Sequence, residues 1–149
     1  MAGYTRAMIV QRWHAWIKQP VFDRAWHEAD VADELAELRT ATSPLNYWSE
    51  LSDVVYTVSR GRWSGHDIDY PISRPQVAIG YVYMYPKYTS RALFFRRAGK
   101  KAQATQTLQS VRNPRKTHKL ETIANEHGIE PKLFIQVCER QLRHWPLLP

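Results

Sequence analysis

The sequence is poor in cysteine and contains no long apolar run. Its single cysteine, Cys138, excludes an internal disulfide framework and any zinc site built from several cysteines. No apolar run approaches the roughly 20 residues that span a bilayer. The first residues also lack the charged end, apolar stretch and cleavage site of a secretory signal. These absences predict a soluble, cytoplasmic protein that contacts no membrane.

Acidic residues are fewer than basic residues. The chain holds 14 Asp and Glu against 21 Lys and Arg, which gives a formal net charge of +7. Such an excess favours contact with phosphate in a nucleotide or nucleic acid, or with an acidic protein, and does not choose between them. With 149 residues, 44% of them hydrophobic, the chain is long enough to fold around a real core.

Glycine is also scarce, and the prolines fall between periodic segments, as is typical of helical proteins. Ser43 can cap a helix that Pro44 begins. The apolar run at residues 76–85 suits a buried strand about as well as a helix, and we expect a helix that Pro86 kinks or interrupts. We expect loops at residues 61–74 and 105–116. The predicted helices cover residues 4–18, 22–39, 44–60 and 75–104, and two more flank His127-Gly128.

Two pairs of acidic residues lie in neighbouring predicted helices. Glu34 and Glu37 are three residues apart, as are Glu50 and Asp53, so each pair shares one helix face. Twelve residues separate Glu37 from Glu50, and a short connection makes the two helices antiparallel neighbours. Four converging carboxylates would repel one another strongly, and a hard divalent cation such as Mg²⁺ is the usual remedy. The pattern therefore predicts a metal site.

A solvated acidic surface is the alternative interpretation, because acidic residues three or four apart commonly lie on exposed helix faces. The two pairs have similar neighbours, E-L-A-E-L and E-L-S-D-V. This similarity favours two helices that turn their carboxylates towards one shared interface.

The segments DELAEL and SELSDVV, within residues 22–60, resemble the all-α nucleoside triphosphate pyrophosphohydrolase superfamily. That superfamily includes MazG, the dimeric dUTPases and dCTP pyrophosphatase, and its signature is ExxE, a variable gap, then ExxD. The resemblance implies an antiparallel helical bundle of MazG-like type that assembles as a dimer or tetramer. It also implies hydrolysis of a nucleoside triphosphate to its monophosphate and pyrophosphate. In this interpretation Glu34, Glu37, Glu50 and Asp53 hold Mg²⁺, and Glu37 or Glu50 accepts a proton from the attacking water.

The sequence departs from the family where phosphate contacts are expected. Members commonly carry a Lys and an Asn four residues apart on the helix after ExxD, whereas Tyr81 and Tyr85 stand in the corresponding region here. Lys87 and Arg91 follow one or two turns later and are candidates for the missing phosphate contact. An ordinary solvated basic face is the alternative.

Two tryptophans near the acidic motifs are candidate platforms for a nucleobase. Trp26 lies two helical turns before Glu34, and Trp48 lies just before Glu50. Flat aromatic rings stack on bases, although a tryptophan in a helical bundle is more often a core anchor.

We expect residues 1–104 to form the MazG-like core, and residues 105–149 to add a linker and a helical pair packed on the same domain. Residues 120–129 are similar to the first part of a helix-turn-helix, with basic residues just upstream. Nucleic-acid binding is therefore a second hypothesis, although residues 132–139 look largely apolar. A diverged, non-catalytic MazG-like interaction module is a third, and Tyr81 and Tyr85 are its main support.

Overall fold

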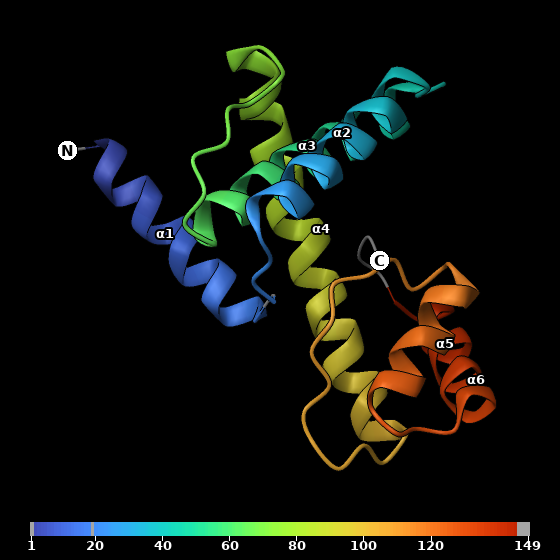
Figure 1. Ribbon diagram of the computed structural model, residues 1–149. Coiled ribbons are helices and arrows are strands. Elements are labelled where there is room, and N and C mark those ends of the chain that lie inside the picture. Colours follow the sequence, from blue (N-terminus) through green and yellow to red (C-terminus); the bar gives the residue numbers. More distant parts are fainter. Residues whose placement is uncertain (1, 19, 146–149) are drawn as a thin grey trace. The chain divides into compact units, whose positions relative to one another are not determined.

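The computed structural model describes residues 2–18 and 20–145, with side chains from residue 8 onward. Within these ranges the chain forms six α-helices and no strand, which confirms the all-α class. None of the described helices combines the length and apolar character needed to cross a membrane. The helices are α1 (Ala2–Ile17), α2 (Arg24–Arg39), α3 (Pro44–Trp63), α4 (Arg74–Lys101), α5 (Thr117–Glu126) and α6 (Pro131–Leu142) (Figure 1).

The ambiguous apolar run at residues 76–85 lies inside α4, so the helix expected there is confirmed. Pro86 lies within the same helix, which continues to Lys101. A proline in a helix interior removes one backbone hydrogen bond but does not end the helix when the flanking turns are well packed.

The chain divides into two compact units, residues 1–85 and 86–149. The division falls within α4 at Pro86, whereas from the sequence we expected the first segment, the helical core, to end at residue 104. The described part of the first unit holds α1, α2, α3 and the first three turns of α4. The second holds the rest of α4, α5 and α6.

In the first unit, α2 and α3 form a helical hairpin, and Figure 1 shows them side by side. The side chain of Asp23 caps α2 by accepting a hydrogen bond of 2.8 Å from the backbone N–H of Trp26. Ser43 caps α3 by accepting one of 3.2 Å from Asn46, and Pro44 occupies the first helical turn as expected. Only residues 40–43 join the two helices, so the chain must reverse sharply.

The interface between α2 and α3 is apolar at its centre. Leu38 of α2 packs with Leu51 and Val54 of α3, and Val31 packs with Val58 nearer the other end. The α3 members of these clusters are completely buried. Burial of each such side chain stabilises the fold by roughly 1.5–3 kcal/mol. This packing fixes which faces of the two helices meet.

Gly80 lets α4 approach α3 closely within the first unit. A Cβ atom built at this position would lie 2.9 Å from the carbonyl oxygen of Leu51 and would overlap the side chain of Val55. Only a residue without a side chain fits there, because neither a backbone carbonyl nor a buried valine can move aside cheaply.

The second unit has a separate core. The indole N–H of Trp145 donates a hydrogen bond of 2.8 Å to Ser90, and the amide of the buried Gln141 donates one of 2.7 Å to the carbonyl of Phe94. These bonds tie α6 and the segment after it to α4. The core consists of Phe94, Phe95, Ala98, Ala102, Leu108, Leu120, Ile123, Ala124, Ile129, Phe134 and Cys138.

Candidate metal centre

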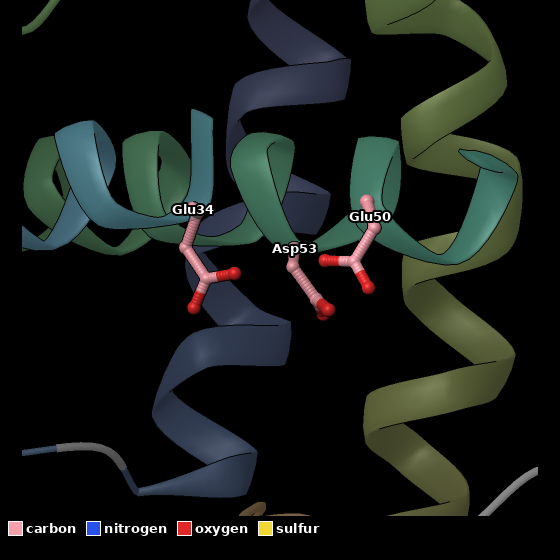
Figure 2. A group of neighbouring side chains, drawn as sticks. All are labelled: Glu34, Glu50 and Asp53. Atoms are coloured by element: carbon pink, nitrogen blue, oxygen red, sulfur yellow. The ribbon is translucent and has the colours of Figure 1, made fainter. Parts of the chain in front are cut away.

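Three carboxylates from the two acidic motifs meet on the α2–α3 hairpin. Glu34 comes from α2, and Glu50 and Asp53 come from α3. One oxygen of each lies within 4.8 Å of the others. The three side chains project in the same direction from the helix pair (Figure 2). All three are half-buried, so the three-carboxylate cluster (Glu34, Glu50, Asp53) is not a fully solvated acidic surface.

The electrostatic environment of this cluster is strongly negative. Burial, followed by the neighbouring Asp53 and Glu37 carboxylates, raises the pKa of Glu34 to about 8. Desolvation and like charges both penalise the ionised form of a carboxyl. A cation placed among these oxygens would relieve that penalty, so the electrostatics favour a positive ligand.

Glu37, the fourth acidic residue of the motif, lies outside the cluster. It is exposed, one turn further along α2 than Glu34, and its charge still contributes to the raised pKa of Glu34. The structure thus brings together three of the four residues expected to share a metal, and the fourth lies at their edge.

A partly buried ion pair continues the same interface towards the other end of the hairpin. Arg60 of α3 donates to the Asp30 carboxylate of α2, and its guanidinium lies 4.7 Å from the ring centre of Trp26. This pair was not predicted from the sequence. Its signal was present, because Asp30 precedes Glu34 by four residues and Arg60 follows Asp53 by seven, which places all four on facing helix surfaces.

Trp26 does not lie beside the three-carboxylate cluster. It precedes Glu34 by eight residues, which is about 12 Å along the helix axis. Its ring stacks on Phe22 with centroids 4.0 Å apart and contacts Arg60 as well. Because these contacts already occupy the ring, a nucleobase stacking on Trp26 would have to displace one of them.

Trp48 is 43% exposed on α3. It precedes Glu50 by two residues, so the two side chains point roughly 200° apart around the helix axis. Proximity in sequence therefore does not bring Trp48 to the carboxylates of its own hairpin.

Lys87 and Arg91 belong to the second unit and are buried, so neither forms part of a solvated basic face. Arg91 donates a hydrogen bond of 3.4 Å to the carbonyl of Val111, and both cationic groups lie over the ring of Tyr88. Arg91 thus helps to hold residues 105–116 against α4.

The tyrosines that replace the expected Lys and Asn are both in the first unit. The hydroxyl groups of Tyr81 and Tyr70 are hydrogen-bonded at 2.5 Å, and the rings of Tyr81 and Tyr85 stack at 6.3 Å. These contacts show a structural use for both residues.

Two buried histidines, His14 of α1 and His27 of α2, lie against α3. His14 Nε2 and Ser59 Oγ are hydrogen-bonded at 2.6 Å, and burial together with the charge of Arg60 lowers the pKa of His14 to about 4. His27 is also fully buried beside Gly61, and its ring contacts Phe22, Trp26 and His66. Burial lowers its pKa. Both are therefore packing residues of the described fold.

Comparison with known proteins yields no relative: no protein-family model matches the chain, and neither a curated protein nor a solved structure shows significant similarity. The function of the site therefore has to be inferred from its residues and their geometry.

Proposed function

We propose that this protein is a Mg²⁺-dependent hydrolase that converts a nucleoside triphosphate to its monophosphate and pyrophosphate. The observation that carries the proposal is the approach of Glu34, Glu50 and Asp53 to within 4.8 Å, at the positions of the ExxE and ExxD motifs. Neither motif alone would require this arrangement, because each could have pointed away from the hairpin interface.

The donor atoms of the three-carboxylate cluster suit a hard divalent cation. Mg²⁺ prefers carboxylate oxygens and keeps part of its shell for water and substrate phosphates, so three protein carboxylates are a suitable set. When bound, such a cation supplies charge neutralisation at the phosphate oxygens. Glu34 would bind the cation as the ionised carboxylate. The positive charge would offset the repulsion from Asp53 and Glu37 that disfavours this ionised form.

Glu37 is the better of the two candidate bases. Glu50 belongs to the cluster and would be engaged as a ligand, whereas Glu37 is exposed and outside it. In the proposed step, water oxygen bonds to the α-phosphorus and the bond from that phosphorus to the bridging oxygen breaks. Glu37 accepts the proton of the water, and pyrophosphate leaves.

Cation binding is tested by thermal unfolding with and without Mg²⁺. We expect Mg²⁺ to raise the Tm of the wild type, since a ligand that binds only the folded state stabilises it. The rise should vanish in Glu50→Gln and persist in Asp33→Asn, a matched control on an exposed neighbour of Glu34. Equal shifts in all three proteins would show that Mg²⁺ does not bind at this cluster.

Turnover is tested by measuring pyrophosphate release from a panel of nucleoside triphosphates with Mg²⁺. We expect Glu37→Gln to lose at least about 100-fold in kcat while it keeps the Mg²⁺-dependent rise in Tm. A Mg²⁺-dependent rise in Tm without turnover of any nucleotide would contradict the hydrolase and match a non-catalytic interaction module.

A further inference from the structure

The second unit contains a helix-turn-helix with its own apolar core. Helices α5 and α6 pack against each other and are joined by residues 127–130, in which Gly128 adopts a positive φ of 64°. Such a four-residue turn with a left-handed glycine is characteristic of the helix-turn-helix. The side chain of Glu130 caps α6 by accepting a hydrogen bond of 2.7 Å from Leu133, which fixes where the second helix begins.

Most apolar residues of α6 face inward. Phe134 and Cys138 are buried, together with Gln141, whereas Leu133 remains 46% exposed. The apolar appearance of residues 132–139 therefore reflects mainly packing within the unit. Burial also raises the pKa of the Cys138 thiol to about 12, so it stays protonated at neutral pH.

The opposite side of α6 is polar and carries more basic than acidic residues. Five exposed residues share this side and form what we call the polar stripe; Arg143 directly follows the helix, and Glu139 is the one acidic member. The polar stripe consists of Lys132, Gln136, Glu139, Arg140 and Arg143.

Charge is distributed unevenly between the units. Residues 86–149 hold 13 Lys and Arg against 4 Asp and Glu, whereas residues 1–85 hold 8 against 10. The excess positive charge of the chain therefore belongs to the second unit. Arg115 and Lys116, both exposed, lie directly before α5 and extend the basic surface around the helix-turn-helix.

We propose that the second unit binds double-stranded DNA, with α6 in the major groove and its polar stripe towards the base edges. An α-helix fits the major groove of B-DNA, where Arg and Lys pair with guanine and Gln with adenine. Arg115 and Lys116, at the start of the first helix, would contact phosphates. Arg112 has a different role, because its guanidinium holds Glu126 of α5 through two hydrogen bonds of 2.7 and 3.0 Å.

The chemistry of the stripe favours duplex DNA over other polyanions. Single-stranded nucleic acids are bound on exposed aromatic rings, and the polar stripe contains none. The major groove of A-form RNA is too deep and narrow for a helix to read. This inference uses no residue of the three-carboxylate cluster and does not depend on the hydrolase.

The test measures fluorescence anisotropy of labelled mixed-sequence duplexes with the full chain, in EDTA so that the result is independent of any metal. We expect binding that weakens steeply with salt, and a loss of about tenfold or more in affinity for Lys132→Gln/Arg140→Gln/Arg143→Gln. In Arg115→Gln/Lys116→Gln, the slope of log affinity against log salt should fall by about 0.9 for each phosphate contact removed.

The matched control removes three exposed positive charges from the first unit, Arg12→Gln/Arg39→Gln/Arg74→Gln. It should bind duplex nearly as well as wild type. Gln136→Ala, which changes no charge, should reduce discrimination between duplex sequences while the salt slope stays constant. Equal losses in the two triple variants, no duplex binding at low salt, or tighter binding to single-stranded DNA or RNA would each overturn the proposal.

Discussion

His14 is a histidine that the fold keeps neutral. It is completely buried in the first unit, its ring stacks on Trp63, and its Nε2 is hydrogen-bonded to Ser59. Burial is the larger cause of its low pKa, and the charge of Arg60 adds to it. An imidazolium at this position would be desolvated and would face a second positive charge.

This environment predicts a pH dependence of stability. The pKa of His14 is about 4 in the folded state and about 6.5 in the unfolded state, so the unfolded chain binds the proton first as pH falls. Neutral His14 therefore contributes roughly 3 kcal/mol to the free energy of unfolding. This contribution is fully present above pH 6.5 and is lost as the pH falls from 6.5 to 4.

Urea unfolding of the wild type and His14→Gln, measured between pH 7.5 and 4, checks this prediction. The wild type should lose more stability across the window, and the difference between the two curves should shrink as pH falls. Parallel curves would show that His14 titrates alike in both states.

The spacing of charged residues in the sequence indicated that carboxylates of α2 and α3 could meet, but not which of the four would do so. Glu50 and Asp53 share a face of α3 because they are three residues apart, and Glu34 occupies the facing surface of α2. The same rule does not say how far a side chain reaches from its helix, so Glu37 was placed with them although it lies outside the group. Burial of His14 could not be predicted, because it depends on contacts with Ser59, 45 residues away.

At the scale of elements, α4 approaches α3 closely at Gly80. Alanine is normally favoured over glycine in a helix by roughly 1 kcal/mol. Here the added methyl would collide with the Leu51 carbonyl and with Val55. We therefore expect Gly80→Ala to destabilise the protein by about 1–3 kcal/mol, since overpacking outweighs the gain in helix propensity.

Chemical denaturation checks the sign of this change. Ala78→Ser, at an exposed position two residues earlier on the same helix, is the control and should cost no more than about 0.5 kcal/mol. A stability of Gly80→Ala equal to or above that of the wild type would contradict close packing of α4 on α3.

Helix positions were predictable because caps and periodicity are local. Ser43 and Pro44 mark the start of α3 in both the sequence and the structure. The run at residues 76–85 was ambiguous, because its valine, isoleucine and tyrosines suit a strand in isolation and only the surrounding helices decide otherwise. The orientation of α6 was not predictable for a related reason: its apolar residues are visible in the sequence, but the side they face depends on packing within the second unit.

At the scale of the whole molecule, the division into units was the least predictable feature. Chain divisions are usually marked by polar or glycine-rich linkers, and the segment 105–116 has that composition. The units instead divide within α4, where nothing but Pro86 marks the position.

Exposed apolar residues on α4 favour the expectation that the protein self-associates. Ile79 and Val82 are three residues apart and remain 43% and 76% exposed. Symmetric helical interfaces commonly bury such pairs. We expect light scattering to give the mass of a dimer or tetramer, and Val82→Glu to shift it towards the 17.5 kDa monomer. A monomeric wild type at micromolar concentration would contradict this.

The four-residue connection between α2 and α3 has a consequence for how any ligand is received. Because both helices are capped and their interface is packed, Glu34 and Asp53 face each other before anything binds. Such a preformed site costs no chain ordering at the moment of encounter. If the three-carboxylate cluster binds a cation as proposed, the speed of capture would be governed by how fast the ion sheds its hydration water, and not by folding of the hairpin.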